Sequence, residues 1–192
     1  MSSLVTLVGN PKSDSRTLSA AGTLADALAE RVDVTHRTVI DLADIAEGLL
    51  APWRLSEAAG QAASDVRTAD LLVIATPTYK ASFTGLLKLF LDVLPAGSLA
   101  STVVVPLTVA GGPAHRHLAD LQLRPVLSEL GAVIPAPTLL LEESELPDLD
   151  DVVRNYVDRH GPVIAAAVGA LASFAPTRLT ATALGATGRG RR

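Results

Sequence analysis

The chain has 192 residues, of which 48% are hydrophobic and 19% charged, so it can bury the core of a globular domain and differs from disordered chains. Its net charge of −4 argues against a general nucleic-acid binder, whose affinity would come from lysine and arginine side chains on the phosphates. It has no cysteine, which excludes disulfides, thiolate metal sites and cysteine nucleophiles, and suits a reducing cytoplasm.

The sequence also carries no sign of export or of a membrane span. Residues 1–8 run directly into a strand pattern, without the cationic start and cleavage site of a secretory signal. The longest apolar stretch, residues 163–172, is well short of the roughly 20 residues needed to cross a bilayer. We therefore expect a cytoplasmic protein with neither a membrane nor a nucleic acid as its partner.

The first half of the chain alternates predicted strands and helices. Residues 4–8 are an apolar run followed by Gly-Asn-Pro, which is typical of a buried strand, and apolar residues at helical spacing indicate a helix over 18–30. Residues 32–40 have the pattern of an edge strand. Residues 42–54 have no clean period and predict an irregular loop, which a helix over 56–68 follows.

The second half repeats this alternation and includes two continuous apolar runs, which indicate strands buried on both faces. The predicted elements are a strand over 70–75, a helix over 82–94, a strand over 102–109, a helix over 114–130, a strand over 133–141 and a helix over 148–172. Pro125 lacks a backbone N–H and should kink its helix. We predict one domain over residues 1–172 and a flexible tail over 173–192, which has no period.

This succession of elements predicts an α/β protein with a parallel sheet between two layers of helices, because parallel strands need crossover connections. Five predicted strands favour the order 2-1-3-4-5 of a flavodoxin-like three-layer sandwich. Ligands of such sheets bind where the strand order reverses, outside the carboxyl ends of the first and third strands. We therefore expect the loops after the first, third and fourth strands to converge on one site.

The loop after the first strand carries hydroxyl groups and a guanidinium at the start of a helix, where backbone N–H groups are free to bind an anion. Ser15 and Thr17 can each donate a hydrogen bond, and Arg16 can add a charge-assisted one. Alternatively, Ser15 is only a helix cap and Arg16 a solvated charge. Asn10 and Pro11 complete the loop, which lacks the triphosphate and dinucleotide fingerprints. A single terminal phosphate, as in FMN, fits this loop best.

The loops after the third and fourth strands could hold the flat ring of such a ligand. The first of them offers backbone amides and Tyr79, although Tyr79 could instead only pack against the sheet. The second contains two glycines, which allow close backbone approach, although a diglycine is more often just a turn. The predicted binding residues of these two loops are Pro77, Thr78, Tyr79, Lys80, Ala110, Gly111 and Gly112.

The remaining polar clusters do not indicate a metal site or a catalytic acid or base. His115 and His117 are two residues apart on a predicted helix and therefore point to different faces. Glu142, Glu143 and Glu145 form an acidic run that we expect to be a solvated loop. The sequence therefore predicts neither a metal ligand nor a catalytic side chain.

Residues 76–88, with the sequence TPTYKASFTGLLK, closely resemble the NADPH-dependent FMN reductases that feed reduced flavin to two-component monooxygenases, notably the alkanesulfonate system. Gly9, Pro11, Ser15, Arg16 and Thr17 match the phosphate loop of that family. Further matches lie at residues 91–95, 106–107, 111–112, 114–115 and 123–127. The resemblance covers roughly residues 4–135.

The resemblance implies FMN at the three loops, NADPH or NADH stacked on the isoalloxazine ring, a homodimer or homotetramer, and a monooxygenase as partner. Hydride would pass from nicotinamide C4 to flavin N5, which requires no general base. The family often carries a tyrosine where this chain has Leu121. That departure leaves open whether FMN is an exchangeable substrate or a bound prosthetic group, and weakens the expectation of a tetramer.

Other classes of protein share this fold. A flavodoxin-like quinone, azo or metal-ion reductase would use the same FMN site with another electron acceptor. A flavodoxin-type electron carrier would bind FMN without nicotinamide, but carriers are usually more acidic and frame FMN with aromatic residues, whereas only Tyr79 is well placed here. A relative that has lost its flavin is disfavoured by the complete set of loop residues.

Overall fold

A five-stranded, all-parallel sheet in the order β2-β1-β3-β4-β5 forms the centre of the computed structural model, which describes residues 2–51 and 54–174. The strands are β1 Ser2–Val8, β2 Val34–Asp41, β3 Leu71–Pro77, β4 Val103–Ala110 and β5 Leu139–Glu142. This order confirms the predicted flavodoxin-like fold, and it reverses between β1 and β3.

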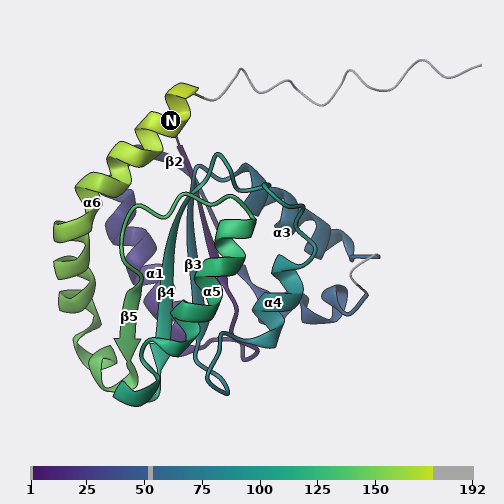
Figure 1. Cartoon of the computed structure of the whole chain (residues 1–192), viewed down its shortest axis with the longest axis horizontal. Helices are drawn as coiled ribbons and strands as arrows, with labels where there is room; N and C mark the ends of the chain where they lie inside the picture. The colour runs from purple at the N-terminus through teal and green to yellow at the C-terminus, as the bar shows by residue number, and fades with distance from the viewer. Residues whose placement is uncertain (1, 52–53, 175–192) are drawn as a thin grey trace, which may run out of the picture.

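Helices cover both faces of the sheet, with α1 and α6 on one side and α3, α4 and α5 on the other (Figure 1). The helices are α1 Arg16–Ala29, α2 Leu42–Ile45, α3 Glu57–Thr68, α4 Gly85–Leu91, α5 Leu118–Glu129 and α6 Leu149–Phe174. Three short 3-10 helices join them: η1 Ala46–Leu49, η2 Pro113–His115 and η3 Glu143–Asp148.

The strand side chains alternate between the two helical layers. On β3, Leu71 and Val73 face the α1 and α6 layer, whereas Leu72 and Ile74 face the other layer. Every residue of β3 and of β4 is buried, which explains why both strands have continuous apolar sequences. The strand ends, and with them the connecting loops, are therefore fixed by a core on both sides.

The predicted irregular loop over residues 42–54 is partly wrong, because α2 and η1 occupy its first half. The Asp41 carboxylate caps α2 by accepting a hydrogen bond from the backbone N–H of Ala43, at 3.1 Å. Leu42 and Leu49 are fully buried and anchor this segment to the core. Two turns of helix are too short to produce a period in the sequence.

Three other predicted elements are longer than the observed ones. The predicted helix over 82–94 is observed only as α4, because Thr84 caps its start and a tight turn precedes it. The strand predicted over 133–141 begins only at Leu139, since Pro135 and Pro137 cannot donate ladder hydrogen bonds. The helix predicted over 114–130 is divided into η2 and α5, and the predicted kink within α5 stays a prediction.

The final helix α6 extends two residues into the stretch that we expected to be a tail. Residues 175–192 lie outside the residues that the structure describes, so the flexible tail stays a prediction. None of the helices in residues 2–51 and 54–174 combines the length and apolar character of a membrane span.

Tyr156 fixes α6 to the segment before β5. Its hydroxyl donates a hydrogen bond to the Pro137 carbonyl at 2.7 Å, and burial raises the pKa of this phenol above its usual range. We expect Tyr156→Phe to lower the free energy of unfolding by about 1 kcal/mol, because this partly buried hydrogen bond is lost. Urea unfolding measures this change. Tyr79→Phe, at an exposed tyrosine, is the matched control and should leave stability unchanged.

The raised pKa of Tyr156 also sets a pH dependence. The unfolded phenol ionises at about pH 10 while the folded one stays neutral, so the unfolded state binds fewer protons above that pH. This contribution to stability is complete below about pH 10 and declines as the pH rises further. In urea titrations the Phe variant should lack this alkaline decline. An unaltered decline would show that other groups cause it.

Candidate functional site

A cavity of about 520 Å³ opens at the carboxyl ends of β1, β3 and β4, where the strand order reverses. Its lining residues lie in or next to the three loops that were predicted to converge, and at the start of η3. The lining residues are Asn10, Lys12, Asp14, Ser15, Arg16, Thr17, Pro77, Thr78, Tyr79, Val109, Gly111 and Glu143. The predicted convergence of the three loops is therefore observed.

The loop after β1 is held in shape by its own side chains. The Ser15 hydroxyl caps α1 by accepting a hydrogen bond from the backbone N–H of Leu18 at 3.1 Å. The Asn10 amide donates to the Thr17 hydroxyl at 3.2 Å, and the Asn10 carbonyl oxygen accepts from the backbone N–H of Lys12 at 3.0 Å. Ser15 is thus a helix cap. Its hydroxyl group can still donate one hydrogen bond to a ligand in the cavity.

Gly9 and Thr84 clamp this loop to α4. A Cβ atom on Gly9 would lie 2.6 Å from the Cβ of Leu87, closer than side chains pack. The Thr84 hydroxyl donates to the Gly9 carbonyl and accepts from the backbone N–H of Leu87 at 3.2 Å. Sequence reasoning placed Gly9 at the end of a strand and in the phosphate loop, but did not predict its contact with Thr84. The contact joins residues 75 positions apart, so no local pattern reports it.

Arg16 is not free in this structure. Its Nη2 atom lies 2.7 Å from Oε1 of Glu143, which lines the same cavity from η3. The two side chains are 66% and 46% exposed, so the pair is a surface ion pair that water and salt weaken. Arg16 is therefore both solvent-exposed and ion-paired, and its role in binding stays a prediction.

The loop after β3 forms a tight turn beside the cavity. The backbone N–H of Tyr79 donates to the Ser82 carbonyl at 2.8 Å, and the Ser82 N–H returns a bond of 3.0 Å to Tyr79. Lys80 and Ala81, between them, have φ angles of 50° and 64°, a conformation that non-glycine residues adopt at a cost of about 1–2 kcal/mol each. A turn in this conformation needs support from the surrounding structure.

Gln122 of α5 supplies that support. Its Nε2 donates to the Ala81 carbonyl at 2.6 Å, and its Oε1 accepts from the Ser82 hydroxyl at 2.7 Å. Tyr79 is 49% exposed and lines the cavity, and its role in binding stays a prediction. A large aromatic surface therefore faces the site.

The loop after β4 contributes Val109 and Gly111 to the lining. A Cβ on Gly111 or Gly112 would meet nothing within 4 Å, and neither residue adopts the left-handed backbone conformation that favours glycine. Packing within the described chain therefore does not require glycine at these two positions. What glycine provides is open space beside the cavity.

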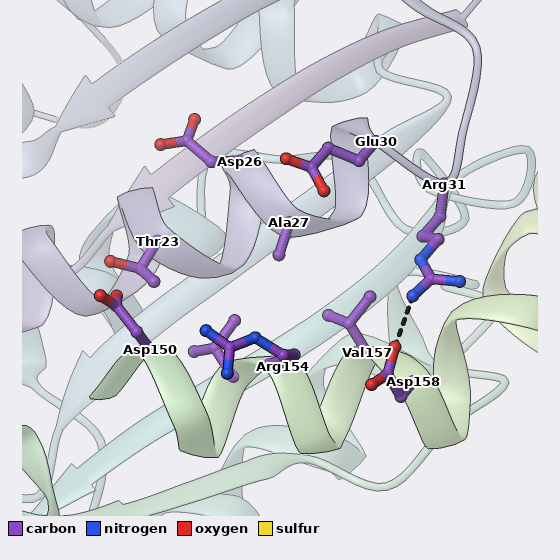
Figure 2. A pocket seen from close by; sticks show the side chains of 10 residues that line it. Thr23, Asp26, Ala27, Glu30, Arg31, Asp150, Arg154, Val157 and Asp158 are labelled. Carbon is purple, nitrogen blue, oxygen red and sulfur yellow. Dashed lines mark hydrogen bonds and ion pairs between the residues drawn. The ribbon is translucent and has the colours of Figure 1, made fainter. Parts of the chain in front are cut away.

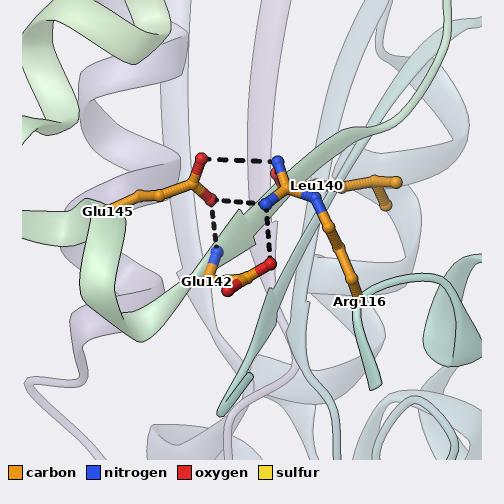
Figure 3. A network of polar contacts seen from close by, with 4 residues as sticks. All are labelled: Arg116, Leu140, Glu142 and Glu145. Atoms are coloured by element: carbon orange, nitrogen blue, oxygen red, sulfur yellow. Dashed lines mark hydrogen bonds and ion pairs between the residues drawn. The ribbon is translucent and has the colours of Figure 1, made fainter. Parts of the chain in front are cut away.

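Arg116, which follows η2, joins the loop after β4 to the end of β5 (Figure 3). Its Nη1 atom lies 2.9 Å from carboxylate oxygens of both Glu142 and Glu145, and its Nη2 donates to the Leu140 carbonyl at 2.8 Å. The prediction that the acidic run is a solvated loop is therefore wrong, because Glu142 and Glu145 are ion-paired and Glu143 lines the cavity.

A second hollow, of about 340 Å³, lies between α1 and α6 (Figure 2). Charged side chains line most of it, and Arg31 closes one end through an ion pair with Asp158. It lies along the helices and not at the strand ends. Among the described residues, no group of three or more histidine, aspartate or glutamate side chains is arranged to hold a metal ion.

Two further observations are compatible with a flavin mononucleotide in this cavity. Thr78 lines the cavity, and its hydroxyl oxygen is buried without a hydrogen-bond partner within the described chain, so it lacks the polar contact that buried hydroxyls normally make. Lys12 and Arg16 provide positive charge at the start of α1, where a phosphate binds best. Sequence reasoning missed Lys12, although its place in the loop after the first strand was a usable signal.

Eight of the twelve residues that the sequence predicted for binding line the cavity. Pro11, Lys80, Ala110 and Gly112 are not part of the lining, and their roles stay predictions. The parallel sheet of order 2-1-3-4-5, with a cavity where the order reverses, defines a protein of the flavodoxin-like class.

Comparison with known proteins assigns the chain to a family. The model of the NADPH-dependent FMN reductase family matches residues 2–145, and the chain belongs to this family. It is 35% identical over 148 residues to the NADH-dependent FMN reductase SfnE of Pseudomonas putida, covering 76% of this chain and 79% of that protein. It is also 35% identical over 146 residues to the FMN reductase (NADPH) of Escherichia coli K12, covering 76% and 75%.

Solved structures agree with this assignment. The apo form of an NADH:FMN oxidoreductase (EMOB) superposes with a TM-score of 0.76 at 32% sequence identity, covering 84% of this chain and 89% of that one. The family, together with the fold, makes the protein an oxidoreductase that uses FMN and a nicotinamide cofactor.

Proposed function

We propose that the cavity at the ends of β1, β3 and β4 binds the FMN that this NAD(P)H-dependent reductase reduces. The phosphate would lie at the start of α1, held by Arg16 and by the hydroxyls of Ser15 and Thr17. The observation that carries this proposal is that an arginine-bearing helix start lines one cavity with Thr78, whose buried hydroxyl has no hydrogen-bond partner among the described residues.

The side chains of this cavity would bind and orient, because the reaction needs no proton-transferring residue. The cavity would hold FMN, which when bound would supply the acceptor for the hydride of the nicotinamide cofactor. Lys12 and Arg16 would attract the phosphate, and Tyr79 would offer an aromatic surface to a flat ring. The strained turn at Lys80 and Ala81, held by Gln122, would keep Tyr79 at the edge of the site. Its rigidity would favour one productive alignment of the reacting atoms.

We further propose that the reduced flavin serves a partner monooxygenase in the cytoplasm and that the enzyme is a homodimer or homotetramer. The resemblance to the reductases of two-component systems supports the partner. Leu121, 66% exposed on α5, and an apolar hollow of about 400 Å³ between α4 and α5 support an oligomer. Size-exclusion chromatography with light scattering measures the oligomeric state.

A steady-state assay tests the function. The absorbance spectrum is recorded first, because flavin that copurifies identifies a prosthetic group. Oxidation of NADPH and of NADH is then followed with FMN, FAD, a quinone and an azo dye as acceptors. We expect NADPH or NADH to reduce added FMN faster than the quinone or the dye. No FMN-dependent oxidation of either nicotinamide would refute the proposal, and a strong preference for the quinone or the dye would support the alternative reductase.

A further inference from the structure

The wall of the FMN cavity contains as many negative as positive side chains. Lys12 and Arg16 contribute two positive charges, whereas Asp14 and Glu143 contribute two negative ones. A phosphate monoester carries about −1.5 to −2 charges at neutral pH, so a site selected only for tight phosphate binding would not include carboxylates. The two carboxylates therefore require an explanation.

Glu143 is the carboxylate whose position the fold specifies. The residues on either side of it form a capping box, in which the backbone N–H of Glu142 donates to Oε2 of Glu145 at 2.8 Å. Arg116 bridges the same two glutamates from the loop after β4 (Figure 3). The backbone that carries Glu143 is thus tied down, and its carboxylate reaches Arg16 at 2.7 Å.

We propose that Glu143 is an internal competitor of the FMN phosphate for Arg16, and that this competition lowers the affinity for FMN and speeds its release. This inference rests on the proposed function of the cavity. The Arg16 guanidinium that would pair with phosphate pairs with the Glu143 carboxylate in this structure. Binding must break that pair and bring a second anion near Glu143, which costs Coulomb energy.

The exposure of the pair sets the size of the effect. Both side chains reach solvent, so the ion pair is worth at most about 1 kcal/mol and phosphate can displace Glu143. That energy corresponds to about a fivefold change in affinity. Glu143 therefore moderates binding without preventing it. A moderated affinity suits an FMN that is released as a product, which is the open question raised by Leu121.

The test compares FMN with riboflavin, which lacks the phosphate. Dissociation constants are measured by quenching of flavin fluorescence at low ionic strength, and release rates by stopped flow. We expect Glu143→Gln to bind FMN about three- to fivefold more tightly and release it more slowly, and to leave riboflavin binding unchanged. Glu57→Gln, at an exposed glutamate on α3, is the matched control and should change neither ligand.

A double variant identifies the route of the effect. In Arg16→Ala, the further change Glu143→Gln should improve FMN affinity by less than it does in the wild type, because the contested guanidinium is gone. Raising the salt concentration should also shrink the difference between wild type and Glu143→Gln.

The outcomes separate this inference from the proposed function. If the wild-type protein binds neither flavin, the function of the cavity is wrong. If it binds FMN and needs Arg16, but Glu143→Gln leaves FMN affinity and release unchanged, the competition is refuted while the cavity remains the flavin site. An equal gain for FMN and riboflavin would also refute it, because the effect would not involve the phosphate.

Discussion

Arg16→Ala weakens FMN binding by about ten- to a hundredfold and changes the free energy of unfolding by less than about 1 kcal/mol. The binding loss corresponds to one charge-assisted hydrogen bond to phosphate, which contributes about 1.5–3 kcal/mol. The stability change is small because the side chain is 66% exposed and its ion pair with Glu143 is also exposed. Fluorescence titration with FMN and urea unfolding measure the two quantities.

Arg154→Ala is the matched control for that variant. Arg154 is equally exposed and pairs with Asp151 on α6, away from the strand ends. It should bind FMN as the wild type does. Riboflavin affinity should change little in Arg16→Ala, since riboflavin has no phosphate. Unchanged FMN affinity in Arg16→Ala would contradict the proposal that the FMN phosphate binds at the start of α1.

Gly9→Ala lowers the free energy of unfolding by about 1–3 kcal/mol and also weakens FMN binding. The added methyl group would lie 2.6 Å from Cβ of Leu87, a fully buried residue of α4, so the strand end or the helix must shift. Such a shift moves the carbonyl that Thr84 binds and with it the loop that begins the cavity. Urea unfolding and FMN titration of the variant measure both effects.

Gly22→Ala provides the opposite case. Gly22 lies inside α1, and a Cβ there would meet nothing within 4 Å. Alanine should therefore stabilise the protein by about 0.5–1 kcal/mol through the lower conformational entropy of the unfolded chain. If both variants lost the same stability, the close approach of Gly9 to α4 would not be the cause.

Much of the fold could be predicted because its signals are local. The continuous apolar sequences of β3 and β4 reflect strands buried on both faces, and the alternation of strands and helices implies the parallel order. Topology then places the loops after β1, β3 and β4 together without any knowledge of their side-chain contacts. For this reason residues such as Ser15, Tyr79 and Gly111 could be assigned to one site from the sequence.

The parts that could not be predicted depend on contacts between distant residues. Glu143 pairs with Arg16 across 127 positions, and Arg116 reaches Glu142 across 26. An acidic run with such partners has the same local pattern as a solvated loop. The left-handed turn at Lys80 and Ala81 is equally hidden, because tertiary support from Gln122 overrides the preference of such turns for glycine or asparagine.

The crystal structure of the protein saturated with FMN tests the central claim most directly. We expect the phosphate at the start of α1, within hydrogen-bonding distance of Arg16, and the ring beside Tyr79 and Gly111. A flavin bound elsewhere, such as in the hollow between α1 and α6, with the cavity at the strand ends filled only by solvent, would contradict it.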